Sequence, residues 1–373
     1  MPGTMNEPEY KNIAVIRLSA LGDIIHTLWA FTLLRGAYPH AKISWFAEPA
    51  GAKLLENFPG IDRVIVTNFK QKGLANKIKE AKRIRSLYGK TKKFDMVLDF
   101  QGLLKSAFLA RLLDGAVTVG FHKKNLREPL ARFFYRRTVD FFDDRALHVV
   151  LKNIHLANFN GRLAALTPPQ LPPPLHPNGL KKMDWDRVKV QLADLSPWEK
   201  AMQEFLARHG LEMNNFLALN VGGGWQSKLL FPGQYIEIVN GAREKYGCRV
   251  VILWGNEKEQ KVAQEVSQKT GAVMADFFNF SQLLLFIRCA RVLVSGDSLP
   301  LHLADLVKTP SVGIFTATSP FRNGSLMPDS VSIYEKLPCG FCYKKKCGTI
   351  ECIKNLDINK IIQTIGTLYE KFS

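Results

Sequence analysis

In the first half of the chain, two charged side chains each lie where a predicted buried strand passes into a helix. Asp23 follows the apolar run 13–18 and precedes apolar positions at helical spacing. Lys105 follows a second run, 94–100, after a turn that contains Gly102. At the carboxyl ends of parallel strands, such a carboxylate could take a proton from a hydroxyl group while the cation holds an anionic substrate. Asp23 could equally serve only as a helix cap, a position that Asp favours.

In the second half, a predicted strand at 216–221 ends in a glycine run. Gly223 and Gly224 permit close approach of a ligand to the backbone. Lys228 supplies a point charge that suits a phosphate group. Taken alone, Lys228 could be an ordinary surface lysine. Two more strand ends carry comparable groups, so we interpret the set as a nucleotide site.

Those two strand ends are acidic. Trp254 is followed by Glu257 and Glu259, and a carboxylate there could hold the diol of a ribose. Asp297 begins a predicted helix whose free N–H groups could bind a diphosphate, together with Ser298 and His302. The alternatives are that Asp297 is a cap and His302 a core residue. Three strand ends with such groups in one domain favour nucleotide binding.

Four of the six cysteines cluster as Cys339-x2-Cys342-x4-Cys347-x4-Cys352. The spacing is compatible with a structural zinc site. No second C-x2-C pair accompanies it, so reduced cytosolic thiols are the alternative. The acidic triplet 184–186 lies in a polar helix start rather than at a strand end, and we do not expect it to bind a metal.

The elements that must position these groups alternate between strand and helix, which predicts two doubly wound α/β domains. Residues 167–179 contain six prolines and are interpreted as a stiff linker. We therefore place an N-terminal Rossmann-like domain at 1–175 and a second at 176–354, facing across a cleft. Neither a G-x-G-x-x-G after the first strand nor a Walker P-loop is present in the sequence.

The charge is strongly basic and uneven. The 373-residue chain carries a net charge of +18, and residues 70–137 hold eighteen Lys or Arg against five Asp or Glu. This concentration suggests an anionic partner: nucleic acid, lipid headgroups or a polyanionic sugar. Residues 121–137 mix cations with Leu130, Phe133 and Phe134, which suits an anionic membrane surface or, equally, a packed helix with an arginine face.

Length and hydropathy set further bounds. A chain of this length favours two domains rather than one core. No apolar run approaches the roughly 18 residues that a membrane span needs. Residues 1–12 lack the apolar segment of a signal peptide, and Met5 is a possible start.

Several motifs together resemble the lipopolysaccharide heptosyltransferases of glycosyltransferase family 9, most closely the heptosyltransferase I group. The resemblance covers nearly the whole chain. The motifs are L-G-D-I-I-H-T-L (21–28), D-F-Q-G-L-L-K-S-A (99–107), R-E-P-L-A-R-F-F-Y (127–135), G-G-W-Q-S-K (223–228), W-G-N-E-K-E (254–259) and G-D-S-L-P-L-H-L-A (296–304).

The resemblance implies a GT-B fold that uses no metal and no cofactor. Its first domain would bind the Kdo-lipid A inner core and its second ADP-L-glycero-β-D-manno-heptose. The last helix, within 355–373, would return to the first domain. The implied location is cytoplasmic, peripheral at the inner face of the inner membrane, where the basic segment 70–137 would meet anionic lipid.

The family's functional residues carry over by position. Asp23 matches the general base, and the acceptor side corresponds to Ser19, Gly22, Gln101, Lys105 and Arg127. Lys228 would hold the donor phosphate, and Glu259, with Glu257 as second choice, the ribose. Asp297 would bind the heptose hydroxyls, and the diphosphate would be lined by Ser298, Leu299 and His302.

One base and a bound diphosphate suggest in-line displacement with inversion at the anomeric carbon. The sequence departs from the family at Asp297-Ser298-Leu299, where the family usually has Asp-Thr-Gly, and by an extra residue after Lys228. Heptosyltransferase II or another family 9 enzyme with a different acceptor is an alternative. So is a non-catalytic polyanion- or membrane-binding relative; nucleic-acid binding is weaker, because no motif for it accompanies the charge.

Overall fold

The computed structural model describes residues 9–69, 74–89, 94–143, 147–163 and 185–372. Their contacts form two compact units. The first comprises 9–163 with 185–193, and the second comprises 194–372. The proline-rich stretch 167–179 and the tail 1–8 lie outside the described residues.

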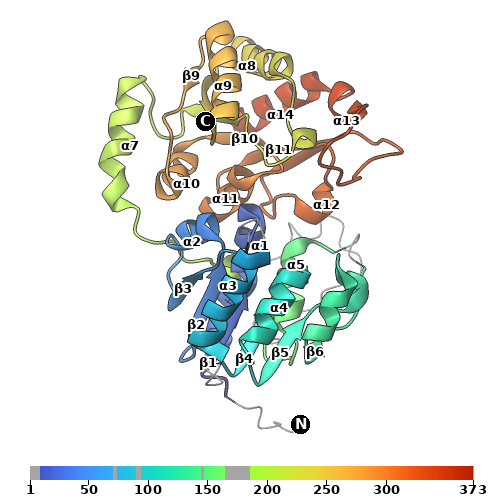
Figure 1. The fold of residues 1–373 in the computed structure, drawn as a ribbon. Helices are drawn as coiled ribbons and strands as arrows, with labels where there is room; N and C mark the ends of the chain where they lie inside the picture. The colour runs from blue at the N-terminus through green and yellow to red at the C-terminus, as the bar shows by residue number, and fades with distance from the viewer. Residues whose placement is uncertain (1–8, 70–73, 90–93, 144–146, 164–184, 373) are drawn as a thin grey trace, which may run out of the picture. The chain divides into compact units, whose positions relative to one another are not determined.

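The first unit contains one parallel six-stranded sheet (Figure 1). Its strand order, β3-β2-β1-β4-β5-β6, reverses direction between β1 and β4. Ligands of doubly wound sheets bind at the carboxyl ends of the strands beside such a reversal. The strands are β1 (Asn12–Ile16), β2 (Lys42–Ala47), β3 (Arg63–Val66), β4 (Met96–Asp99), β5 (Val117–Gly120) and β6 (Arg137–Thr138).

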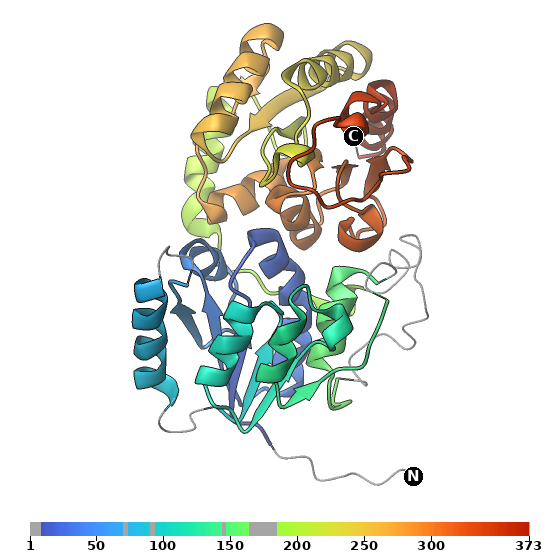
Figure 2. The ribbon, with the colours of Figure 1, turned by 45° about the vertical axis from the view of Figure 1, so that its right-hand side comes forward.

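In the first unit α1 packs along α5, and α3 also contacts α4. Figure 2 shows α3 as the light-blue helix at the outer edge of this unit. The α-helices of this unit are α1 (Leu21–Ala37), α2 (Pro49–Leu55), α3 (Leu74–Ile84), α4 (Leu104–Leu112) and α5 (Val149–Ala157). A π-helical turn, η1 (Arg85–Gly89), extends α3. Short 3-10 segments are η2 (Lys123–Asn125), η3 (Pro129–Phe134) and η4 (Trp185–Val188).

The second unit repeats the topology, with strand order β12-β11-β10-β7-β8-β9 and the reversal between β7 and β10. Its strands are β7 (Phe216–Asn220), β8 (Arg249–Leu253), β9 (Val273–Met274), β10 (Val292–Gly296), β11 (Ser311–Phe315) and β12 (Val331–Tyr334). Its helical segments are α7 (Ser196–Arg208), η5 (Gln226–Lys228), α8 (Pro232–Tyr246), α9 (Glu257–Thr270), α10 (Phe280–Cys289), α11 (Leu299–Val307), α12 (Pro320–Asn323), α13 (Glu351–Lys354) and α14 (Ile358–Lys371). The expected pair of doubly wound domains is thereby confirmed.

Strands at the centre of both sheets are buried on both faces, which is why they consist of continuous apolar runs. Ile13, Val15 and Ile16 of β1 are fully buried, as are Leu217 and Leu219 of β7. Fully packed central strands hold their carboxyl ends rigidly, so the loops that follow them present fixed side chains.

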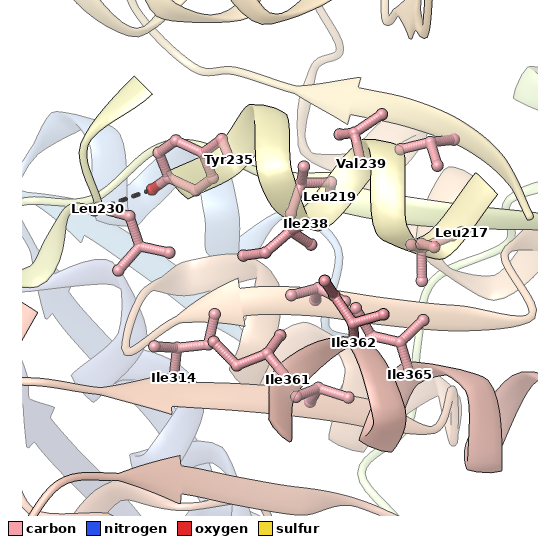
Figure 3. Close-up of a cluster of buried hydrophobic side chains, with 14 of the residues drawn as sticks. Leu217, Leu219, Leu230, Tyr235, Ile238, Val239, Ile314, Ile361, Ile362 and Ile365 are labelled. Atoms are coloured by element: carbon pink, nitrogen blue, oxygen red, sulfur yellow. Dashed lines mark hydrogen bonds between the residues drawn. The ribbon is translucent and has the colours of Figure 1, made fainter. Parts of the chain in front are cut away.

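The expectation that residues 355–373 return to the first domain is wrong for α14. This helix packs on α8, β10 and β11 of the second unit. Figure 3 shows Ile361, Ile362 and Ile365 pointing into the cluster formed with Ile238 and Ile314. The apolar stripe of α14 therefore belongs to the core of the second unit.

Glycine at position 241 makes this packing possible. A Cβ added to Gly241 in α8 would lie 2.4 Å from Ile362, closer than side chains approach each other. Tyr235 of the same helix caps the cluster, where its hydroxyl accepts a hydrogen bond from the Leu230 N–H at 3.3 Å (Figure 3). The α8–α14 contact is thus part of the core of this domain.

The boundary predicted at 175/176 is also corrected, because residues 185–193 belong to the first unit. Trp185 packs edge-on against Trp29, with ring centroids 5.3 Å apart. The Ala193 N–H donates to the Asn57 carbonyl at 2.8 Å. Buried aromatic packing thus holds this segment to the first unit, although it follows the proline-rich stretch in sequence.

Residues 121–137 do not form the single helix that their composition suggested. They form two 3-10 turns and enter β6. Leu130 and Phe133 are exposed, but Phe134 packs edge-on against Phe108 of α4. The predicted aromatic face is therefore divided between solvent and the protein. No helix in the described ranges is long and apolar enough to span a bilayer.

Candidate active site

Asp23 lies at the topological reversal of the first sheet, in the first turn of α1. Its carboxylate Oδ1 is 2.8 Å from the guanidinium of Arg17, which directly follows β1. Its other oxygen accepts a hydrogen bond from the Ala20 N–H at 3.3 Å. The side chain keeps 42% of its surface exposed. Asp23 therefore does brace the helix start, yet its carboxylate remains open to a ligand.

Arg17 was not anticipated from the sequence as a functional residue. Its side chain is 91% buried and also donates to the Phe100 carbonyl after β4, so it joins the two strands at the reversal. An arginine inside an otherwise apolar strand run is the signal that could have identified it, because such a cation is seldom buried without a partner.

Gln101 fixes the loop that precedes Asp23. Its side-chain oxygen accepts from the N–H groups of Leu18 and Ser19, both at 3.1 Å. Ser19 and Gly22, the other expected acceptor-side residues, are half-buried in this loop and the first turn of α1. The predicted residues Ser19, Gly22, Asp23 and Gln101 are thus brought together.

A buried carboxylate organises the loop that carries Gln101. Asp99, fully buried at the end of β4, accepts from the hydroxyls of Tyr135 and Ser106 at 2.7 and 2.8 Å. It also accepts from the N–H groups of Gln101 and Gly102. Burial raises the pKa of Asp99 despite these donors. Asp99 serves as a scaffold for the loop.

Lys105 pairs with an acid that the sequence reasoning missed. Its ammonium lies 2.7 Å from the carboxylate of Glu48, which follows β2 and is buried. Glu48 could have been found by the same rule that selected Asp23, because each lies where a buried parallel strand passes into a helix. Arg127 is exposed and makes no ion pair within the described ranges. Asp23, Lys105 and Glu48 share one sheet edge, since β1, β2 and β4 are adjacent and parallel.

In the second unit, Glu259 joins two strand-end loops. Its carboxylate accepts from the Gly223 N–H at 3.1 Å and from the Gly255 N–H at 2.8 Å. A Cβ at Gly222 would lie 2.4 Å from a Glu259 oxygen, so glycine at this position leaves room for the carboxylate where it stands. Glu257 is exposed at the start of α9. Of the two predicted glutamates, only Glu259 contacts both loops.

Asp297 is the centre of a buried charged cluster. The side chain is 3% exposed, and its Oδ2 lies 2.7 Å from the Lys228 ammonium. The Asn323 side chain donates to the same oxygen at 3.1 Å, and His302 Nε2 lies 3.2 Å from Oδ1. Burial favours a higher pKa, but the His302 contact and the Lys228 charge outweigh it and hold the pKa of Asp297 well below its ordinary value.

Lys228 is held in a fixed position by this cluster. It donates to the carboxylate and to the backbone carbonyl of Asp297, and its ammonium stands 4.5 Å from the Trp225 ring centre. An ammonium has three N–H donors, so one remains for a ligand. The cluster joins the loops after β7 and β10. Asn323, which completes it from α12, has no local sequence signal.

The helix start beside Asp297 is braced by Asn220 at the end of β7. The Asn220 amide donates to Ser295 and Ser298, both at 3.0 Å, and to the Gly222 carbonyl. Leu299 begins α11, so the departure from the family's glycine falls in the first helical turn. Asn220 was missed, although a polar residue ending an apolar strand is a visible signal.

The residues 225–228 are tied to the cysteine-containing loop. The Ser227 hydroxyl donates to the Lys344 carbonyl at 2.6 Å, and the Thr316 hydroxyl donates to the Ser227 carbonyl at 2.5 Å. Trp254, the last of the expected donor residues, is half-buried and donates from Nε1 to the Ala275 carbonyl at 2.8 Å. The β7 and β8 ends are therefore held by side chain to backbone contacts.

The four clustered cysteines do not form a metal-binding group in this structure. Among the described residues, no three His, Cys, Asp or Glu side chains are arranged to hold an ion. Cys339, Cys342 and Cys347 are exposed free thiols. Hydrogen bonding by Thr349 lowers the pKa of Cys347, and burial raises that of Cys352. The spacing alone therefore did not establish a zinc site.

A family model described as glycosyltransferase family 9 (heptosyltransferase) matches residues 82–352. Lipopolysaccharide heptosyltransferase 1 of Campylobacter coli is 29% identical over 320 residues, which cover 83% of this chain and 85% of that protein.

Two solved structures share the fold. The glycosyl transferase family 9 protein from Veillonella parvula has a TM-score of 0.71 and 22% identity, and covers 97% of this chain and 98% of its own. E. coli heptosyltransferase WaaC with ADP-2-deoxy-2-fluoro heptose has a TM-score of 0.68 and 20% identity, and covers 95% and 99%. These likenesses confirm the expected GT-B fold.

Proposed function

This chain belongs to glycosyltransferase family 9, and we propose that it transfers L-glycero-D-manno-heptose from ADP-heptose to the Kdo-lipid A inner core of lipopolysaccharide. The curated relative from Campylobacter coli supports the heptosyltransferase I assignment, and the WaaC structure, which holds an ADP-heptose analogue, supports the donor. The observation that carries the proposal is an accessible carboxylate, Asp23, at the reversal of a doubly wound sheet.

Asp23 acts as the general base in the proposed reaction. The acceptor hydroxyl oxygen forms a bond to the anomeric carbon of the heptose while the bond from that carbon to the diphosphate oxygen breaks. The hydroxyl proton passes to Asp23, and ADP leaves with the electron pair. Attack opposite the leaving group inverts the anomeric centre. General-base assistance of this kind contributes about 10²- to 10⁴-fold in rate.

The second unit supplies the electrostatic part of the reaction. The remaining N–H of Lys228 and the N–H groups at the start of α11 meet the charge that develops on the diphosphate. Asp297 acts through Lys228, because its own oxygens already contact Lys228, His302 and Asn323. Glu259 shapes the loops around the ribose. No metal or cofactor enters the proposed steps.

On the acceptor side, Lys105 and Arg127 bind the Kdo carboxylates and the phosphates of lipid A. Arg127 is exposed and Lys105 retains a third of its surface, so both can reach an anionic ligand. The basic segment 70–137 favours an acceptor at an anionic membrane surface, on the cytoplasmic face where nucleotide sugars are available.

The deciding assay supplies ADP-heptose with Kdo-lipid A, and separately with Kdo-lipid A that already carries one heptose. We expect transfer to the first and not to the second, with an anomeric configuration in the product opposite to that of the donor. A preference for the heptosylated acceptor would instead assign heptosyltransferase II activity. Unchanged turnover in a chelator is expected, and its loss would contradict the metal-independent mechanism.

A non-catalytic role remains the second candidate, because Leu299 replaces the glycine that the family usually has beside the diphosphate. Calorimetric titration with ADP-heptose separates the two. A catalytic enzyme binds the donor, whereas a polyanion-binding relative gives no heat with it.

A further inference from the structure

The first unit contains a cavity of about 860 Å³ between α3, α4 and η3. Eight of its twelve lining residues are apolar. Its size falls within the range of small-molecule sites in proteins, roughly 300–1,000 Å³. Except for Lys105, none of the proposed catalytic or substrate-binding residues lines it.

Large apolar side chains in this cavity face solvent. Ile78 of α3 is 46% exposed, and Leu104 and Phe108 of α4 are 37% and 40% exposed. Leu104 and Phe108 are one helical turn apart and form one wall, opposite Ile78. Apolar residues gathered around a concave site, with a few polar groups beside them, are typical of ligand pockets. The cavity is thus suited to a hydrocarbon ligand.

Cations flank the apolar walls. Lys82 and Arg85 line the cavity, are exposed, and form no ion pair with any residue that the structure describes. Glu128 is the one acid in the lining, and its Oε2 already accepts the Leu104 N–H at 2.6 Å. Apolar walls with unneutralised cations match an amphiphile that has an acyl chain and an anionic head group.

Lys105 connects this cavity to the candidate active site. It lines the cavity, and its ammonium contacts Glu48 on the sheet edge that carries Asp23. A lipid whose chain occupies the cavity would therefore place its polar part beside the acceptor site. We propose that the cavity holds an acyl chain of the lipid acceptor, while Lys82 and Arg85 bind its phosphates. This inference rests on the proposed function.

For a lipid that is monomeric in solution, the buried acyl chain should contribute strongly to binding affinity. Each methylene buried from water raises affinity about fourfold, so four methylenes favour binding by about 10²-fold. A chain taken from a micelle gains far less, because it leaves a site that is already apolar. A test therefore needs an acyl ligand that is monomeric in solution.

The first measurement uses fluorescence of dansyl-undecanoic acid, which needs no catalytic turnover. We expect saturable binding to the full-length protein and at least tenfold weaker binding to Phe108→Asp and to Ile78→Asp. Both side chains are substantially exposed, so both variants are expected to fold. Phe108→Asp loses the edge-on contact with Phe134, so its Tm should fall slightly, and Ile78→Asp, with a Tm close to wild type, shows whether weaker binding depends on that loss. Phe133→Asp is the matched control: Phe133 is 82% exposed on η3 but does not line the cavity, and its binding should change less than twofold.

The second measurement adds dioctanoyl phosphatidic acid, below its micelle concentration, to heptosyl transfer onto deacylated Kdo-lipid A. Competitive inhibition is expected, with an inhibition constant at least tenfold higher in Phe108→Asp. Glycerol 3-phosphate, which lacks the chains, should not inhibit at the same concentrations.

Each other outcome has a defined meaning. Equal loss of probe binding in Phe133→Asp and Phe108→Asp would overturn the cavity in favour of general surface adsorption. Probe binding without competition against the acceptor would assign the cavity to a bulk membrane lipid, and so overturn the acceptor assignment. Retained probe binding with no transfer to any acceptor would contradict the proposed function and leave the cavity as a lipid site.

Discussion

The two sheets share one topology, yet they hold their charged groups differently. In the first unit, Asp23 and Lys105 each form one ion pair and remain partly exposed. In the second, Asp297 is buried and contacts three side chains, including Lys228. The same strand-end position thus supports an accessible acid in one unit and an enclosed one in the other.

This difference matches two chemical tasks. A general base must reach the proton that it removes, so it has to stay accessible. A group that stabilises a leaving phosphate acts best when it is already held in position, and hydrogen bonds and ion pairs to neighbouring side chains hold it there. We infer that the first edge exchanges protons and that the second supplies preorganised charge.

Asp23→Asn should lower kcat for heptosyl transfer by about 10²- to 10⁴-fold, because the amide cannot accept the proton. Asp62→Asn is the matched control, since Asp62 is also a half-exposed aspartate paired with an arginine, Arg35. Steady-state rates with ADP-heptose and Kdo-lipid A check this. Unchanged turnover in Asp23→Asn would remove the base from the mechanism.

Asp297→Ala should reduce the free energy of unfolding by about 3–5 kcal/mol, because it leaves Lys228 without its buried partner. Asp23→Ala also leaves a buried partner, Arg17, but Asp23 itself is 42% exposed, so water can take its place, and the cost should be smaller, about 1–2 kcal/mol. Urea unfolding of both variants measures the contrast. Similar losses in the two proteins would contradict the proposed difference between the edges.

The pH dependence of stability should have opposite signs for the two buried aspartates. The pKa of Asp297 is lowered, so its contribution is present above the ordinary Asp pKa of about 3.9 and is lost as pH falls through the folded value. The pKa of Asp99 is raised by burial, so its contribution is greatest below about pH 3.9 and is lost as pH rises through the folded value.

Comparing wild type with Asp297→Asn and with Asp99→Asn, by urea unfolding between pH 3 and 7, isolates these contributions. One titrating group changes stability by at most about 1.4 kcal/mol per pH unit. The difference in free energy of unfolding between wild type and Asp297→Asn should become smaller towards low pH. The difference between wild type and Asp99→Asn should become smaller towards high pH. Parallel slopes would show that the two carboxylates sit in equivalent electrostatic environments.

Glu259→Gln should raise the KM for ADP-heptose about tenfold. The amide keeps one accepting oxygen, so one of the two loop N–H groups loses its hydrogen bond. The lost hydrogen bond is worth about 1–2 kcal/mol. Glu257→Gln should change the KM less than twofold, because Glu257 is exposed and contacts neither glycine loop among the described residues. Donor titrations of both variants decide which glutamate serves the nucleotide. Equal changes of KM in the two variants would show that the contacts of Glu259 with both loops do not matter for donor binding.

The sequence by itself determined the alternation of strands and helices and the position of Asp23, Lys105, Lys228 and Asp297 at strand ends. Those features follow from local hydrophobic periodicity and from the fixed direction of parallel strands. Glu259 could also be selected, although the sequence left open whether Glu257 took its place.

Only the tertiary structure decided the partners. Glu48 lies 57 positions from Lys105, and Asp297 lies 69 positions from Lys228, so no local pattern encodes either pair. Residues 121–137 and α14 were misjudged because burial against distant elements decides where such segments pack. The apolar cavity likewise arises where α3, α4 and η3 meet in space. Charge partners and cavities depend on distances in space, and hydrophobic periodicity reports only the face that each element buries.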